Sequence, residues 1–583
     1  MQRLTYARVA ALLLGAAGLH LVSAVAAPSV ARACGCFAQS NPATPVIQGG
    51  ERIVFAMEDG EVTAHIQIQY SGAAEDFAWL VPLPSMPTME LGVDELFTQL
   101  IQQTQPSYRW FRTGPECPFS GGGSDAGVPP PPPPPPPPSG PGSPVVEQGS
   151  VGPYAYTVLA ADDKQLLSNW LAEEGYFVPT NGDEALDPYI RPGAFFLALK
   201  LRTGETVGDL QPIVVRYRSE LPQIPIVLTS VGAERDMPVM VWMLGDSRAI
   251  PRNYYHTHIN DALIDWLDNG ANYVEVVTAA VDEADGAHSF VTEYAGSSNR
   301  MLGLLDPEWR FGDVVELRAI DEPIAYIEFL TAWQYQVSPL LFPILEEQLP
   351  IPAGLEEAVG YEISYPEFYF NARNFAEANP ELFADAFSGF DPDALTTELD
   401  ERIVTPTRDA GQLFRDHAYM TRLFTTLSPE EMNMDPVFSF NPDLPEVSNV
   451  HSAELRLLEC LPGGGRDDFG AALLVTEQGW RLFLPEGRAT GDWPGAPLPA
   501  SQRIEVLREE GQAVVMVDNA ELIEDGVNDY RPVPDPLPSP EPPDPTNPPS
   551  RMSGGCTAGT GAGGGVGGLL LLLGLALQRR RRR

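Results

Sequence analysis

The sequence predicts an α+β protein with a largely antiparallel, β-rich N-terminal domain carrying short helices, a helical middle region and a β-rich C-terminal region. Three patterns indicate this class. Apolar residues alternate with mainly polar ones over 62–70, as in a half-buried strand. Helical spacing dominates from about 301 to 436, and short apolar runs bounded by turn residues return after 437.

The N-terminal domain should contain a series of strands and three short helices. Helices are expected over 93–103, from an N-cap at Asp162 to a stop at Gly175, and after Asn260. Consecutive strands at 213 and 226, joined by a Pro-containing turn, predict an antiparallel pair. Beyond 62–70, strands are expected at 77–81, 154–160, 195–201, 213–217, 226–230, 239–244 and 273–277.

The rest of the chain should be helical first and then β-rich. Helical spacing covers 326–336, 370–377 and 410–425, and a capping box at 428–431 with Pro429 at its first helical position predicts a further helix start. Gln478 and Gly479 fit a hairpin turn. The C-terminal strands are expected at 454–457, 471–476, 480–484, 503–507 and 513–517.

Composition divides the chain into six parts. The unbroken proline run at 129–138 predicts a solvated polyproline II insertion, with a binding site for a proline-reading partner as the alternative. The parts are a signal peptide (1–33), a β-rich α+β domain (34–300) with a Pro-rich insertion (114–152), a mainly helical region (301–436), a β-rich region (437–532), a Pro/acidic stalk (533–555) and a sorting tail (556–583).

The N-terminus reads as a secretory signal. Two arginines precede an apolar stretch at 9–27, and Ala31 and Ala33 supply small residues for cleavage between Ala33 and Cys34. We therefore expect signal peptidase to process the chain, with a retained signal anchor as the alternative. Arg32 disfavours a lipoprotein signal.

The C-terminus reads as a membrane-retained tail. As a helix, residues 557–577 are long enough to cross the bilayer core, although only their second half is strongly apolar. A cytoplasmic stop follows, formed by Arg579, Arg580, Arg581, Arg582 and Arg583. The order of Cys556, a short hydrophobic helix and an arginine cluster resembles the MYXO-CTERM sorting tail. That resemblance implies cleavage by a sorting protease and a lipid at Cys556; a plain single-span anchor is the alternative.

Charge and cysteine usage agree with export. The net charge of −43 argues against nucleic-acid partners, which need a basic face. An oxidising compartment predicts two disulfides among Cys34, Cys36, Cys117 and Cys460, with the pairing open. A metal or redox site at Cys34 and Cys36 is the alternative, but their spacing is not that of a CxxC motif.

The chain contains no common catalytic signature, such as HExxH, GxSxG or a P-loop. His256 and His258 are the best metal candidates, because residues i and i+2 of a strand face the same way. Asp246 or Asp261 could add a carboxylate to a Zn²⁺ site. The alternative is a surface turn whose histidines cap the following helix.

Acidic loops and tryptophans suggest two further ligand classes, calcium and carbohydrate. The acidic loop at 282–286 does not fit an EF-hand, because its first and last ligand positions would fall on Val281 and Thr292. Looser Ca²⁺ binding at 435–443 stays open. The tryptophans 79, 170, 242, 266 and 480 lie on predicted strands or helix faces, so we expect core packing, with a carbohydrate platform as the alternative.

Several short motifs follow each other in an order typical of one bacterial family. They are the Cys-Gly-Cys-Phe at 34–37, the strand and turn at 77–84, and segments at 170–176, 214–219 and 244–246. In these the chain resembles domain-of-unknown-function family 2330, a family of uncharacterised exported proteins without an established activity. The resemblance covers 34 to about 292 and is expected to extend to segments at 423–432 and 440–451, which resemble those of larger members.

The sequence as a whole predicts an exported, C-terminally anchored envelope or cell-surface protein. Its role is expected to be non-catalytic, that is structural, adhesive or ligand-binding, with other envelope partners unidentified and no resident cofactor expected. A secreted metal-dependent hydrolase using His256 and His258 is the first alternative. A maturation or assembly factor for other exported proteins is the second.

Overall fold

A computed structural model describes residues 47–71, 78–114, 144–176, 180–202, 210–459, 470–485, 498–530 and 533–534. All five cysteines, the proline run and both predicted terminal segments lie outside these residues. The described chain contains helices and mostly antiparallel sheets in about equal shares, which confirms the α+β class. Its helices include none with both the length and the apolar character that a membrane crossing requires.

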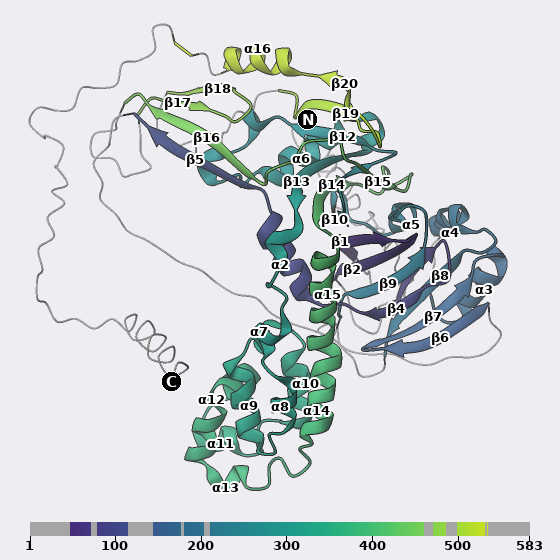
Figure 1. Cartoon of the computed structure of the whole chain (residues 1–583), viewed down its shortest axis with the longest axis vertical. Helices are drawn as coiled ribbons and strands as arrows, with labels where there is room; N and C mark the ends of the chain where they lie inside the picture. Colours follow the sequence, from purple (N-terminus) through teal and green to yellow (C-terminus); the bar gives the residue numbers. More distant parts are fainter. Residues whose placement is uncertain are drawn as a thin grey trace, which may run out of the picture.

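A ten-stranded sheet forms the centre of the molecule (Figure 1). The pairs β1–β10 and β12–β13 are parallel, and the other neighbours are antiparallel. Strands from both ends of the described chain meet in this sheet. In spatial order they are β20 (Val514–Asp518), β19 (Ser501–Val506), β12 (Tyr255–Ile259), β13 (Ser289–Ser297), β14 (Tyr419–Leu427), β10 (Met237–Gly245), β1 (Ile47–Glu58), β2 (Glu61–Ser71), β9 (Ile213–Arg218) and β4 (Thr88–Leu91).

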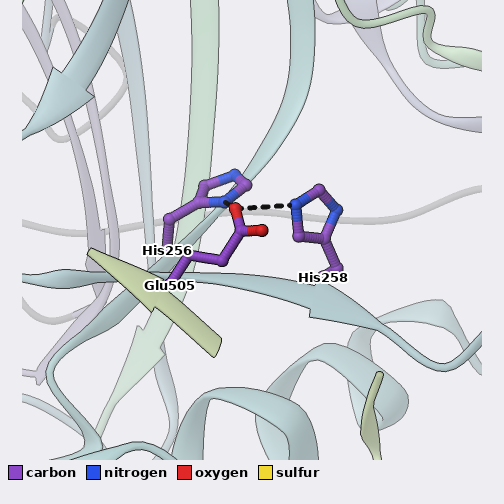
Figure 2. A group of neighbouring side chains, drawn as sticks. All are labelled: His256, His258 and Glu505. Carbon is purple, nitrogen blue, oxygen red and sulfur yellow. Dashed lines mark hydrogen bonds and ion pairs between the residues drawn. The ribbon is translucent and has the colours of Figure 1, made fainter. Parts of the chain in front are cut away.

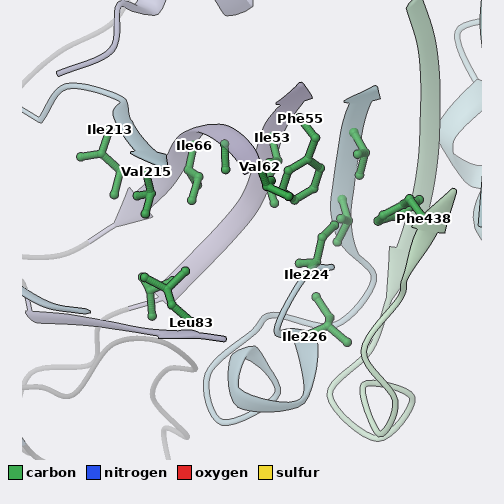
Figure 3. Close-up of a cluster of buried hydrophobic side chains, with 14 of the residues drawn as sticks. Ile53, Phe55, Val62, Ile66, Leu83, Ile213, Val215, Ile224, Ile226 and Phe438 are labelled. Carbon is green, nitrogen blue, oxygen red and sulfur yellow. The ribbon is translucent and has the colours of Figure 1, made fainter. Parts of the chain in front are cut away.

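A second sheet packs against one half of the first and encloses the largest core. Its order is β3 (Ala78–Leu83), β8 (Phe195–Leu201), β7 (Tyr154–Ala160) and β6 (Val145–Val151). Figure 3 shows apolar side chains of this core, among them Phe55, Val62 and Leu83. The alternation predicted over 62–70 is what points Val62, Ala64 and Ile66 into it.

Three short helices cover the outer face of the second sheet. They are α3 (Lys164–Glu173), α4 (Thr180–Leu186) and α5 (Ile226–Thr229). The Asp163 side chain caps α3 by accepting from two backbone N–H groups, so the N-cap lies one residue beyond the predicted Asp162. Asp162 instead accepts from the backbone N–H of Gly193.

A third sheet lies near the opposite end of the ten-stranded sheet. Its order is β18 (Arg481–Leu484), β17 (Ala472–Val475), β16 (Val450–Leu457) and β5 (Ser107–Thr113). Helix α6 (Tyr273–Asp282) shares one apolar core with strands of both sheets. A two-stranded sheet of β11 (Arg248–Pro251) and β15 (Phe438–Asn441) and helix α16 (Ala520–Tyr530) complete this end. The predicted turn at Gln478 and Gly479 joins β17 to β18, as expected.

A helical lobe is inserted between β13 and β14, which are neighbours in the large sheet. It projects away from the sheets in Figure 1. Its base packs on α2 (Asp94–Thr104), where Arg310 and Glu95 form a buried ion pair at 2.6 Å. The lobe contains α7 (Pro307–Phe311), α8 (Val314–Arg318), α9 (Pro323–Ala332), α10 (Leu341–Gln348), α11 (Leu355–Val359), α12 (Tyr365–Ala378), α13 (Pro380–Phe383), α14 (Pro392–Leu399), the π-helical turn η9 (Asp400–Val404) and α15 (Thr405–Asp416).

Short 3₁₀ turns link the elements. They are η2 (Asp187–Tyr189), η4 (Asp261–Leu263), η5 (Trp266–Asp268), η6 (Asp285–Ala287), η7 (Ser298–Met301) and η8 (Tyr335–Val337).

Two segments predicted as strands are helices. Residues 226–229 form α5 and residues 273–277 begin α6. The predicted pairing of 213 with 226 is therefore wrong, and β9 pairs with β2 and β4 instead. Both segments are rich in β-branched residues, which favour strands locally. In α6, the inward positions Val276, Val277, Ala280 and Val281 bury a helical face, and that burial outweighs the local preference.

The predicted helix at 410–425 is wrong in its second half. Helix α15 ends at Asp416, and residues 419–427 form β14, a strand flanked on both sides by other strands. Only half of the predicted capping box at 428–431 forms. Glu431 accepts from the Ser428 backbone N–H at 2.6 Å, but the Ser428 hydroxyl donates to Asp236 and does not accept from the Glu431 N–H. This half of the box closes a turn after β14 and starts no helix.

Candidate metal centre

The candidate site lies on one face of the large sheet, where β12 pairs with β19. His256 and His258 are two residues apart on β12, so their side chains share a face, as the sequence predicts. In the antiparallel register, His256 lies opposite Glu505 and His258 lies opposite Arg503. Four polar side chains therefore gather on this face, and three of them converge in Figure 2.

One carboxylate oxygen lies between the two imidazoles. Glu505 Oε2 is 3.1 Å from His258 Nε2 and 3.6 Å from His256 Nδ1, and the three candidate ligand atoms all lie within 4.8 Å of one another. Zinc bonds of about 2.1 Å in a tetrahedral arrangement place ligand atoms about 3.4 Å apart. The spacing therefore needs only a small adjustment to hold a Zn²⁺ ion.

The protonation states at neutral pH also suit a metal ion. Burial lowers the pKa of His256 to about 3, and the Glu505 carboxylate only partly opposes this effect. For Glu505, burial alone would raise the pKa, but the neighbouring histidines outweigh burial and lower it. A neutral imidazole and an ionised carboxylate are the forms that bind metals.

Neighbouring polar groups hold the far side of each buried ligand. Thr292 Oγ1 and Arg248 Nη2 lie 3.0 Å and 3.3 Å from His256 Nε2, and Arg503 Nε lies 3.0 Å from Glu505 Oε1. The carboxylate thus uses Oε1 for Arg503, and its Oε2 faces the histidines. Such outer contacts orient metal ligands and tune their affinity.

The hydrogen bonds of His256 depend on which ring nitrogen carries the proton. A guanidinium can only donate, so the contact with Arg248 favours the tautomer in which Nε2 accepts and Nδ1 carries the proton. A metal ion on Nδ1 would move that proton to Nε2. The Thr292 hydroxyl oxygen, which also accepts from Arg248 at 3.1 Å, has a second lone pair to receive it.

The cluster is closed on one side and open on the other. The side chains of His256 and Glu505 are 2% and 6% exposed, whereas that of His258 is 37% exposed. Three protein ligands with an accessible side leave a fourth position for water or another ligand, as in catalytic zinc sites.

The two aspartates suggested as extra ligands do not join the cluster. Asp261 accepts hydrogen bonds from Thr476 and from the Gln478 backbone, and burial raises its pKa to about 7. Asp246 lies exposed in the turn between β10 and β11. The alternative in which the histidines cap a helix is wrong, because Asn260 caps the 3₁₀ turn that follows β12.

The sequence does not predict Glu505, the third candidate ligand. It lies 247 residues from His258, and only the pairing of β12 with β19 brings the two together. The strand predicted at 503–507 does indicate that Arg503 and Glu505 share a face. Nothing in the sequence identifies its partner strand.

The other candidate ligand positions serve the fold. Asp435 accepts hydrogen bonds from the Tyr189 hydroxyl and the Val227 backbone, and Asp443 accepts from the Gly511 backbone. Four of the five tryptophans are buried, as core packing predicts, so they form no exposed carbohydrate platform; these are Trp79, Trp170, Trp242 and Trp266.

Comparison with known families identifies a family match in the N-terminal half of the chain. Residues 28–331 match DUF2330, described as an uncharacterised protein conserved in bacteria, and the match covers just over half of the chain. The chain belongs to this family. Comparisons with curated proteins and with solved structures found no match. The DUF2330 region contains His256, His258 and Thr292 but not Glu505, so the candidate site joins it to the C-terminal part of the chain.

Proposed function

We propose that this DUF2330 protein is an exported envelope protein, retained at the cell surface by its C-terminal tail, whose folded body binds one transition-metal ion. Zn²⁺ suits the donor set best, with His256, His258 and Glu505 as ligands. The observation that carries this proposal is the Glu505 Oε2 atom lying between two imidazole nitrogens.

A non-catalytic role accounts for the position of the ligands. The histidines lie on β12 and the carboxylate on β19, so a bound ion would link strands more than 240 residues apart in the chain. Binding only to the folded state would stabilise the pairing of the DUF2330 region with the C-terminal strands.

Elemental analysis of the purified protein tests the metal. We expect one Zn²⁺ per chain in the wild type, and its loss in His256→Ala, His258→Ala and Glu505→Gln. His451→Ala is the matched control, because His451 also contacts a glutamate, Glu477, at 3.1 Å but is outside the cluster. Wild-type protein that takes up no zinc, or equal zinc in all four variants, would contradict the proposal.

A metal-dependent hydrolase is the second candidate, and one observation favours it. Two histidines and a glutamate are the ligand set of several catalytic zinc sites, and the exposed side of His258 leaves room for a bound water. Hydrolysis of ester and peptide substrates by the zinc-loaded protein, lost in Glu505→Gln, would establish it. A protein that holds one zinc ion per chain but hydrolyses neither class of substrate would support the non-catalytic metal-binding role instead.

The location has its own test, independent of the metal. The secretory signal and the arginine-terminated tail support it, as predicted from the sequence. The intact mass of the cell-associated protein should show cleavage between Ala33 and Cys34, and a lipid or processing at Cys556. Untrimmed protein in the cytoplasm would contradict export.

A further inference from the structure

A separate polar cavity lies far along the large sheet from the metal ligands, where β1 and β2 meet α2 and the start of β9. Its volume is about 140 Å³. Since one water molecule takes up about 30 Å³ in the liquid, the cavity has room for about five waters, which is more than a packing defect. A small organic molecule would fit.

Two opposite charges in the cavity wall are kept apart by one amide. Arg52 Nη1 donates to Gln67 Oε1 at 3.0 Å, and Gln67 Nε2 donates to Asp94 Oδ1 at 2.6 Å. All three residues line the cavity. Among the described residues no ion pair joins Arg52 to Asp94, although each charge affects the pKa of the other. Both charges therefore keep capacity for a second partner.

A third polar group in the wall has no partner. Trp79 lines the cavity and is 2% exposed, and its indole N–H has no acceptor anywhere in the described structure. A buried donor without an acceptor costs about 1–3 kcal/mol, so a bound water or ligand that accepts from it would recover that cost. A ligand carboxylate has two oxygens and can accept from both Arg52 and Trp79.

We propose that this cavity binds a small zwitterion of the α-amino-acid type, with its carboxylate on Arg52 and Trp79 and its ammonium on Asp94. An α-amino acid carries both charges within a few bonds, at a spacing comparable to the amide of Gln67 that now separates Arg52 from Asp94. Burial raises the pKa of the Asp94 carboxyl, and a bound ammonium group would offset the cost of burying the ionised form. The site does not depend on the metal cluster, and it would give this envelope protein a solute-binding role.

The test compares ligands that differ by one charge. Calorimetric titration of the full-length protein uses L-alanine, propionate, which lacks the ammonium, and ethylamine, which lacks the carboxylate. L-alanine should bind at least about tenfold more tightly than either analogue, because propionate loses the charge-assisted bond to Asp94 and ethylamine loses those from Arg52 and Trp79. This comparison needs only wild-type protein, so it does not depend on a variant folding.

Two variants assign the charges. Asp94→Asn should weaken the binding of L-alanine but not that of propionate. Arg52→Gln should weaken the binding of L-alanine but not that of ethylamine. The control is Arg216→Gln, because Arg216 pairs with Glu90 beside this region but does not line the cavity. Propionate or ethylamine binding as tightly as L-alanine would overturn the proposal. So would no binding of L-alanine, glycine or L-serine.

Discussion

Replacing Thr292 with valine should weaken metal binding without removing a ligand. Valine keeps the shape of threonine and loses the hydroxyl that lies 3.0 Å from His256 Nε2. With a metal on Nδ1, the Nε2–H group needs an acceptor, and the nearby Arg248 guanidinium can only donate. Without a metal, Nε2 instead accepts from Arg248. The substitution therefore penalises mainly the metal-bound state.

The size of this effect follows from the burial of His256. A buried N–H group left without an acceptor costs about 1–3 kcal/mol, which corresponds to about a 5- to 150-fold loss of affinity. The substitution also removes the hydrogen bond from Arg248 to Thr292. That loss affects the metal-free and the metal-bound protein alike, so it largely cancels in the binding free energy. The measured range for outer contacts at zinc sites, about 10- to 100-fold, lies within this interval.

Competition between the protein and a chromophoric zinc chelator measures the affinity. Thr421→Val is the matched control, because the Thr421 hydroxyl accepts from the buried Ala249 backbone N–H and contacts no imidazole. We expect the control to bind zinc as the wild type does. Equal affinities for wild type and Thr292→Val, or equal losses in both variants, would refute the tautomer argument.

The remaining predictions concern stability. Burial, helped by the charge of Arg216, lowers the pKa of His65 to about 3, so below pH 6.5 the unfolded state binds a proton that the native state does not. Between pH 7.5 and 5 the wild type should therefore lose about 2 kcal/mol more unfolding free energy than His65→Leu, by urea titration, whereas parallel curves would contradict the assignment. Arg310→Met leaves Glu95 buried without its partner and should cost about 3–5 kcal/mol. Replacing the exposed Arg373, which pairs with a glutamate at the surface, should cost less than about 1 kcal/mol, and similar losses in both variants would show that burial is not the cause.

Patterns confined to a few neighbouring residues were predicted well. The alternation in β2, the helix spacing of α3 and α12, and the hairpin between β17 and β18 each depend on contacts that the local sequence encodes. The secondary-structure predictions that are wrong concern segments whose conformation depends on packing against residues far away in the sequence. Residues 273–277 form a helix because two sheets provide apolar surfaces for one helical face of α6.

The candidate site divides in the same way. The spacing of His256 and His258 predicts that both side chains share one face of a strand, and β12 places them so. Glu505 joins the histidines only because β19 pairs with β12. Neighbouring strands in a sheet can come from distant parts of a chain, as in the pairing of β5 with β16, which places Phe111 opposite Glu454. One sequence without its sheet order therefore predicts two of the candidate ligands and not the third.

The insertion of the lobe between β13 and β14 determines where the protein could be shortened. Family similarity stops at residue 331, inside α9, and a fragment cut there would lack β14. That strand separates β13 from β10, so its removal would leave two sheet edges open in the middle of the molecule and expose them to aggregation. Expression of the family region alone should therefore extend at least through residue 427, and through β19 if the three candidate metal ligands are to be kept together.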